Sequence, residues 1–259
     1  MRMMKKVLGT VTVLALSVSL LAGCGSTAAS PVSSAASTAA ESTTSSVVSE
    51  TTSAAADENV AAAAQLLNDL TGSYQELWPV ILADEYQQTW LDDCTALVGE
   101  ENAEAAFEKL SSMVTGDVYG EDAVEAYANG GGAYFCGFTN DLATLTFDGE
   151  TSTISGTDKD GNVLFSHTYH YIGMEPVHGL YEFESDDADS GEFTYFFLAP
   201  DTSAETYHIE FRYGSDAEAL SQYDAGEYAY WVASGISTDC DQTMIDNCIE
   251  LFCTENLAG

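Results

Sequence analysis

The segment Thr206-Tyr207-His208-Ile209-Glu210-Phe211-Arg212-Tyr213-Gly214 alternates between polar and apolar residues, as a β-strand does. Successive side chains of a strand point to opposite faces, so His208, Glu210 and Arg212 share one face and the apolar residues share the other. One interpretation of the polar face is a Glu–Arg pair beside a solvated histidine. The other is that His208 and Glu210 point into the mouth of a barrel and help to hold a divalent cation.

Similar strand-like runs precede this segment and begin just after the triple glycine at residues 130–132. With it they make seven: residues 134–138, 143–147, 152–155, 163–172, 180–184, 192–198 and 207–213. Asp148-Gly149 and Asp160-Gly161 stand between neighbouring runs and are residue pairs typical of hairpin turns. Short polar turns predict an antiparallel meander, and closure into a barrel would remove its exposed edges. We therefore expect a mainly β fold, an antiparallel β-barrel of a size that can hold one small ligand.

Helices are expected on both sides of the strand region. Apolar residues recur at helical spacing in residues 60–70, 84–115 and 121–127, and a further turn is expected at 215–220. A closing helix has an apolar face made of Met244, Ile245, Cys248, Ile249 and Phe252. Asp239, with Gln242 three residues on, is the expected N-cap of this helix, which we expect to pack on the barrel.

The N-terminus has the pattern of a lipoprotein signal peptide. Basic residues precede a short apolar run that ends in Leu21-Ala22-Gly23-Cys24, which resembles a bacterial lipobox. The alternative is a plain secretory signal cleaved near Cys24. We expect residues 1–23 to be removed, Cys24 to be lipidated, and the protein to be extracytoplasmic, anchored to the bacterial cell membrane by its lipid.

The rest of the chain divides into a tether and one domain. Residues 24–57 are mostly Ser, Thr, Ala and Val, a composition that cannot bury enough apolar surface to fold, so we expect a disordered tether. Residues 58–259 are enough for a single domain with a sizeable core.

The charge of the chain excludes some classes of partner. It contains 42 Asp and Glu against 6 Lys and Arg; loss of residues 1–23 removes three of the basic residues, so the mature formal charge is 3 − 42 = −39. Nucleic-acid binding depends on Lys and Arg and is therefore not expected. A strongly negative surface concentrates cations, which favours a cation as ligand.

The cysteines give no metal or redox motif. Five remain besides Cys24, none with C-x-x-C spacing, and their odd number leaves at least one thiol free. They are Cys94, Cys136, Cys240, Cys248 and Cys253.

Three motifs carry a resemblance to a known family. They are Gly72-x-Tyr74 with Pro79 downstream, residues 195–200 (Tyr-Phe-Phe-Leu-Ala-Pro), and residues 208–214. Together they resemble the ZinT (YodA) family, exported zinc- and cadmium-binding proteins of calycin-like fold, and the similar C-terminal domain of some zinc-uptake lipoproteins. The resemblance covers about residues 66–255. It implies a calycin- or lipocalin-like barrel with flanking helices and a site for zinc or another divalent cation.

The family's metal site consists of three histidines, and this chain departs from it. His208 matches the first histidine of a His-x-His strand, Glu210 replaces the second, and Phe196 stands at the earlier histidine. Zinc sites normally need three protein ligands, and the match supplies two. Either Glu205 or His178 completes the site, or this chain has lost tight zinc binding.

The remaining histidines and acidic residues have simpler interpretations. His167 and His170 are three apart in an expected strand, so they face opposite sides and form a poor chelating pair. His178 is expected to be exposed in a turn. The acidic residues 186–189 lack the glycine and distant glutamate of a calcium-binding loop, and we expect a solvated hairpin turn there.

Three functions remain open. The first, which the resemblance implies, is a membrane-anchored metal-binding protein that serves an ABC-type metal importer. The second is a lipocalin-like module for a small organic ligand, and the third is an envelope interaction protein without a ligand. An enzyme is not expected, because the sequence has no nucleophile–base pattern, phosphate-binding loop or three-ligand catalytic metal motif.

Overall fold

The computed structural model describes residues 47–258. The expected signal peptide, Cys24 and the first part of the expected tether lie outside these residues, so lipidation and the division of the chain remain predictions. The described part begins with helix α1 (Val47–Asp69). Among residues 47–258, no helix has both the length and the apolar character needed to cross a bilayer.

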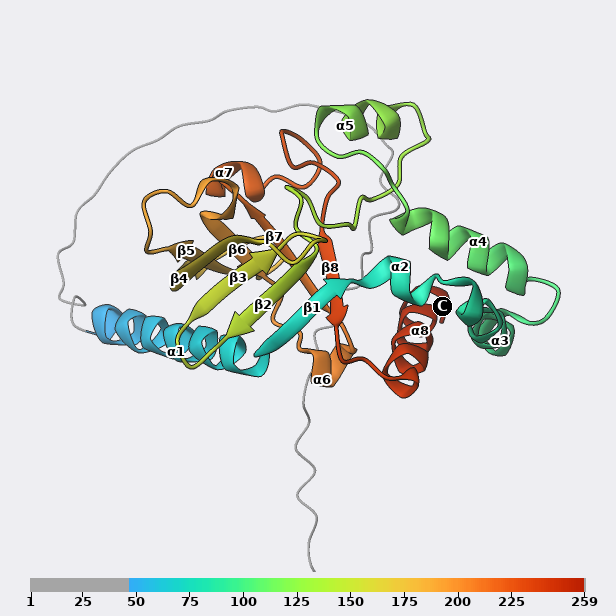
Figure 1. Cartoon of the computed structure of the whole chain (residues 1–259), viewed down its shortest axis with the longest axis horizontal. Helices are drawn as coiled ribbons and strands as arrows, with labels where there is room; N and C mark the ends of the chain where they lie inside the picture. The colour runs from blue at the N-terminus through green and yellow to red at the C-terminus, as the bar shows by residue number, and fades with distance from the viewer. Residues whose placement is uncertain (1–46, 259) are drawn as a thin grey trace, which may run out of the picture. The chain divides into compact units, whose positions relative to one another are not determined.

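Eight strands form a closed antiparallel barrel in the order of the sequence (Figure 1). Each strand pairs with the next one, and the last pairs with the first. The strands are β1 (Gly72–Glu76), β2 (Thr144–Asp148), β3 (Thr153–Thr157), β4 (Val163–Met174), β5 (Tyr181–Ser185), β6 (Tyr195–Leu198), β7 (Ile209–Gly214) and β8 (Ala233–Ser237). The expected calycin- or lipocalin-like barrel is therefore confirmed.

The barrel differs from the expectation at its two ends. Neither β1 nor β8 was expected as a strand. The strand expected at residues 134–138 does not form: Phe135 makes only isolated bridges with Thr115 and Trp231. The hairpin turns at Asp148-Gly149 and Asp160-Gly161 are confirmed, since they join β2 to β3 and β3 to β4.

The barrel interior is filled by aromatic and aliphatic side chains. On β7, Ile209, Phe211 and Tyr213 are 0–2% exposed and belong to this core. Phe196 of β6 pairs directly with Tyr213 and packs against it with ring centroids 5.4 Å apart. Because side chains alternate along β7, its polar residues face the outside of the barrel. The expectation that they point into a barrel mouth is wrong.

Helix α1 packs against the barrel at β2 and β4. It contributes Ala63, Leu66, Leu67 and Leu70 to the barrel core. The remaining helical elements are α2 (Leu77–Ile81), η1 (Asp84–Tyr86), α3 (Gln87–Val98), α4 (Ala103–Val114), α5 (Glu121–Ala128), η2 (Gly191–Phe193), α6 (Ser203–Thr206), α7 (Ala217–Leu220) and α8 (Gln242–Leu257).

A second core lies outside the barrel, where α2, α3, α4 and α8 gather beside β1 and β8 (Figure 1). Trp90 of α3 is fully buried there, and Ile236 of β8 connects this core to the barrel wall. Helix α8 begins two residues later than expected: Asp241, not Asp239, is its N-cap and accepts a hydrogen bond from the Met244 amide. Its apolar face packs mainly on α3, and also on α2 and α4, in the second core, whereas it was expected to pack on the barrel.

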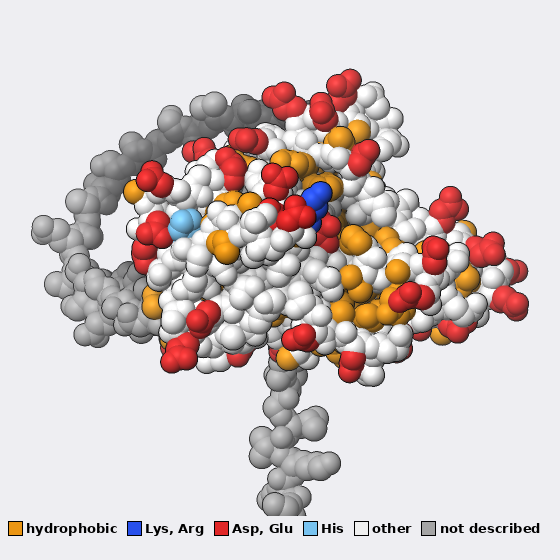
Figure 2. Space-filling model, in the orientation of Figure 1, with side chains coloured by type: hydrophobic (Ala, Val, Ile, Leu, Met, Phe, Trp, Pro, Cys, Tyr) orange, Lys and Arg blue, Asp and Glu red, His pale blue; other side chains and the backbone are white. Residues whose placement is uncertain are grey.

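Acidic side chains are spread over the surface, and few basic ones are visible (Figure 2). The only basic residues after the expected signal peptide are Lys109, Lys159 and Arg212, and Arg212 is fully buried. The described surface is thus even more negative than the composition suggests.

Candidate metal site

A left-handed residue positions His208 at the start of β7. Helix α6 ends at Thr206, and Tyr207 follows with φ = 66°, which turns the chain sharply into the strand. The His208 ring nitrogen Nδ1 lies 2.8 Å from the Thr206 carbonyl oxygen, and the Thr206 hydroxyl donates to the His208 carbonyl at 2.9 Å. A carbonyl oxygen only accepts, so Nδ1 carries the proton and Nε2 keeps its lone pair in the neutral ring.

Glu210 lies two residues further along the same face. The His208 Nε2 and Glu210 Oε1 atoms are 3.8 Å apart, with the two side chains 18% and 32% exposed. The expected juxtaposition of imidazole and carboxylate is therefore present, on the outer face of the barrel. Cys248 of α8 completes the surroundings, with its Sγ 3.8 Å from His208 Nδ1. We call His208, Glu210 and Cys248, which lie between β7 and α8, the outer cluster.

Further carboxylates surround this pair. Burial raises the pKa of Asp201, and the Glu210 carboxylate raises it further. Burial likewise raises the pKa of Glu255 on α8, with Glu210 and Asp201 adding to the effect and His208 opposing it. These shifts place Asp201 and Glu255 within electrostatic reach of His208 and Glu210.

The pKa of His208 reflects the same environment. Burial disfavours the charged imidazolium, but the neighbouring Cys248 and Glu210 outweigh burial, so the His208 pKa lies well above its usual value. A proton and a metal ion would therefore compete for Nε2.

The donors of the outer cluster fit a cation only in part. Within residues 47–258, no three His, Cys, Asp or Glu side chains lie close enough together to hold a metal ion as they stand. Glu205 lies on α6, where it helps to raise the pKa of Asp201. A complete site needs the nearby carboxylates to move or water to fill the remaining positions.

His178 has a different environment. It lies in the turn between β4 and β5, where its Nδ1 is 3.5 Å from Glu175 Oε2 and its ring lies 3.8 Å from the Tyr223 ring. It is partly buried, not exposed as expected, and the structure does not bring it into a ligand cluster with His208.

Phe196 shows why the family's three-histidine pattern cannot be transferred directly. Its side chain points into the barrel core, whereas His208 and Glu210 lie on the outer face. A histidine at this position would therefore face away from the other two donors. The three matched positions do not share a face of the sheet in this chain.

Arg212 has a structural role on the same outer face. It does not pair with Glu210. Its guanidinium donates to the backbone carbonyls of Leu220, Gln222 and Tyr228 and lies 4.2 Å above the Tyr223 ring. Burial lowers the pKa of Arg212. The Arg212 guanidinium therefore holds residues 220–228 against β7 by hydrogen bonds.

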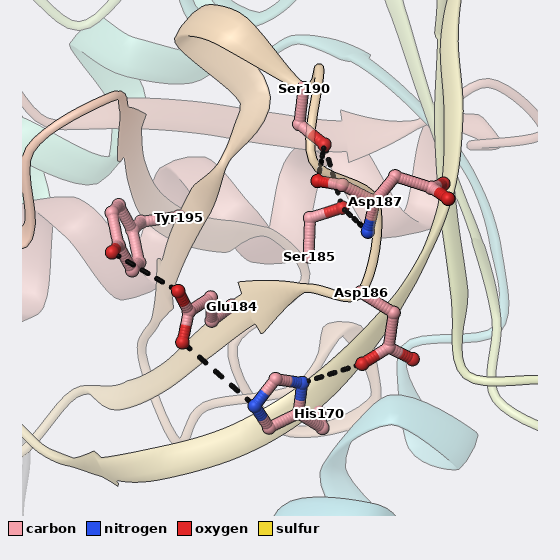
Figure 3. A network of polar contacts seen from close by, with 7 residues as sticks. All are labelled: His170, Glu184, Ser185, Asp186, Asp187, Ser190 and Tyr195. Atoms are coloured by element: carbon pink, nitrogen blue, oxygen red, sulfur yellow. Dashed lines mark hydrogen bonds and ion pairs between the residues drawn. The ribbon is translucent and has the colours of Figure 1, made fainter.

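The remaining histidines contact the acidic residues at and after the end of β5, and Figure 3 shows the contacts of His170. His170 Nδ1 lies 2.8 Å from Asp186 Oδ1 and its Nε2 lies 3.9 Å from Glu184 Oε2, while His167 Nδ1 lies 2.7 Å from Asp187 Oδ2. As expected, the two histidines lie on opposite faces: His167 stacks on Phe165 of the core, and His170 is half-exposed. The acidic turn is thus held by histidines.

Sequence reasoning missed Asp201, Cys248 and Glu255 as neighbours of His208. Cys248 was assigned only to the apolar core. Glu255 is seven residues after Cys248, which puts both on one face of α8. Asp201 follows directly after the Ala-Pro pair that ends β6, and β6 and β7 are hydrogen-bonded neighbours. The helical spacing of Cys248 and Glu255 was a usable signal, but the sequence did not show which strand this face of α8 lies against.

No protein-family model and no curated protein matches the chain. Among solved structures, it is similar to the Zn(II)-bound ZinT-like domain of AdcA from Streptococcus pneumoniae, with 17% identity and a TM-score of 0.44 over 71% of this chain and 89% of that one. It is also similar to Zn(II)-bound AdcA from the same organism, with 16% identity and a TM-score of 0.42 over 70% of this chain. The match spans 34% of AdcA.

Proposed function

We propose that this protein binds a divalent cation of the zinc type at the outer cluster, with His208 and Glu210 as its direct ligands. In the same proposal it is exported, anchored to the membrane through lipidated Cys24, and supplies an ABC-type metal importer. Binding, not catalysis, is the function.

The observation that carries the proposal is the orientation of the His208 ring. Its Nδ1 donates to the Thr206 carbonyl, so Nε2 faces Glu210 Oε1 across 3.8 Å. In metal sites, the ring nitrogen of a histidine that does not bind the metal commonly donates a hydrogen bond, which fixes the tautomer of the ring. Zinc–nitrogen and zinc–oxygen bonds are about 2.0–2.2 Å each, so His208 and Glu210 would hold one ion with little movement of either side chain.

The surroundings of the pair determine the strength of binding. Burial is the main cause of the raised pKa values of Asp201 and Glu255, and a bound cation would relieve the additional repulsion from Glu210. Two direct protein ligands are fewer than a closed zinc site has. We therefore propose exchangeable rather than permanent binding, which suits a protein that passes its cation on.

The small-molecule alternative has no support in the barrel interior. Rings of the core contact one another, as Phe196 and Phe211 do with Tyr213, and these three side chains are 0% exposed. A ligand there would have to displace this packing.

The test is a zinc titration of the purified mature protein, previously stripped of metal, by calorimetry and by competition with a chromophoric chelator. We expect one ion per chain, and at least about a tenfold weaker affinity in His208→Ala and in Glu210→Ala, because each change removes one of two direct ligands. Asp201→Asn and Glu255→Gln should weaken binding less.

His170→Ala is the matched control, because His170 is also paired with carboxylates but lies on another part of the barrel. It should bind zinc as the unmodified chain does. Stoichiometric binding that survives both His208→Ala and Glu210→Ala would move the site elsewhere, and the absence of zinc binding in the unmodified chain would refute the proposal.

A further inference from the structure

The second core holds two cysteines whose sulfur atoms touch. Cys94 of α3 and Cys253 of α8 are 159 residues apart in sequence, yet their Sγ atoms lie 3.9 Å apart and both residues are 0% exposed. This contact lies outside the barrel, and neither cysteine belongs to the outer cluster.

Aromatic packing sets the register that brings the sulfurs together. Trp90 is one turn before Cys94 on the same face of α3, and Phe252 is next to Cys253 on α8. The Trp90 and Phe252 rings meet edge to face with centroids 5.9 Å apart, and the Trp90 indole NH donates to the Ile81 carbonyl at 2.7 Å. These contacts hold the two helices in a fixed position relative to each other.

We propose that Cys94 and Cys253 form a disulfide bond in the exported protein. The sulfurs need to approach by about 2 Å to reach the bond length of about 2.05 Å, and the proposal assigns this approach to rotation of the two cysteine side chains. Cys136, by contrast, has Trp78 and Ser234 as its side-chain neighbours.

The bond requires an external disulfide, such as glutathione disulfide or the disulfide of a thiol oxidoreductase. One cysteine thiolate attacks it, forms a mixed disulfide and releases one thiolate. The second cysteine thiolate attacks the sulfur of the first, the Cys94–Cys253 bond forms, and the second external thiolate leaves. Two cysteines are oxidised, one external disulfide is reduced, and the two thiol protons pass to solvent or to the leaving thiolates.

The folded state restricts when this exchange takes place. Both thiols are shielded from solvent, and burial raises the pKa of each, which removes the reactive thiolate. The exchange therefore takes place during folding, before α8 packs onto α3. Reduced protein that is already folded should react slowly with the same oxidant.

The test is to unfold and reduce the full chain, refold it in glutathione redox buffer, block free thiols by alkylation and digest it with a glutamate-specific protease. Cleavage after glutamate places Cys94 in peptide 86–100, Cys136 in 126–150, Cys240 and Cys248 together in 228–250, and Cys253 in 251–255. We expect peptides 86–100 and 251–255 to appear as one linked species, lighter than their sum by two hydrogens. The oxidised chain should melt on the order of 10 °C higher than the same chain refolded with reductant.

Cys136→Ala is the control and should retain the linked peptide. Cys94→Ala and Cys253→Ala should lose it, together with the difference in melting temperature between oxidised and reduced protein. Since that difference is measured within the unmodified chain, the test holds even if a variant does not fold. Unlinked peptides 86–100 and 251–255 in the refolded chain, or linkage of either one to another cysteine, would overturn the proposal.

Discussion

Single residues of β7 show how far side-chain chemistry follows from the sequence. The alternation of the strand placed His208, Glu210 and Arg212 on one face, and the structure has them there. The same alternation could not tell the inner from the outer face, because both faces are covered: one by the barrel core, the other by α8 and residues 220–228. Which side a covering element occupies depends on pairing between distant segments.

Arg212 provides a prediction about stability. Replacing it with methionine, which has similar length but no donors, leaves the carbonyls of Leu220, Gln222 and Tyr228 without their partner. We expect the free energy of unfolding to fall by about 3 kcal/mol or more, measured by urea denaturation. Arg212→Lys keeps the charge but not the planar fork and should lose less. Equal stability of Arg212→Met and the unmodified chain would mean that this group does not fasten the loop.

Among the elements, β1 and β8 are the ones that sequence patterns did not reveal. In β1 only the central Tyr74 is buried, and β8 is the segment Ala-Ser-Gly-Ile-Ser, with small residues that have little intrinsic preference for strands. Both strands form because each hydrogen-bonds to the other and to a second neighbour. The strands β4 to β7 were predictable, because each carries an apolar pattern of its own.

The contact between α1 and the β2–β3 hairpin gives a prediction about elements. A Cβ atom at Gly149 would lie 2.4–2.6 Å from backbone atoms of Leu67 and Asn68, so the glycine allows α1 to approach the hairpin. Gly149→Ala should force the two apart and destabilise the protein by about 1–3 kcal/mol in thermal or urea unfolding. Gly131→Ala is the control, since nothing lies within 4 Å of its Cβ position, and it should change stability by less than about 0.5 kcal/mol. A Gly149→Ala variant as stable as this control would show that the contact is loose.

For the whole molecule, the excess of carboxylates predicts how stability depends on pH. Burial raises the pKa of Asp93, helped by Glu250, and burial also raises the pKa of Glu182. One Asp93 oxygen is buried without a hydrogen-bond partner. Because these groups bind protons more tightly in the folded than in the unfolded state, stability falls as pH rises from their usual values near 4 through the raised ones. The raised pKa of His208 acts in the same direction at higher pH, since its contribution is present below about 6.5 and is lost as pH rises through the folded value.

We therefore expect the melting temperature to be higher at about pH 5 than at about pH 8, and the difference to shrink in high salt, which screens repulsion between exposed carboxylates. Differential scanning fluorimetry across this range measures both effects. Asp93→Asn should stabilise the protein at pH 8 and reduce the dependence on pH. A melting temperature that rises steadily from pH 5 to pH 8 would contradict this account.

The seam between β1 and β8 has a consequence for biogenesis. The strands that close the barrel lie near opposite ends of the folded region, so the cylinder cannot shut until almost the whole polypeptide is available. A chain that leaves the cell in extended form, N-terminus first, would emerge with β1 waiting for its partner, its edge open to mispairing. Chaperones at the exit side, or rapid arrival of the final segment, would then govern the yield of native protein.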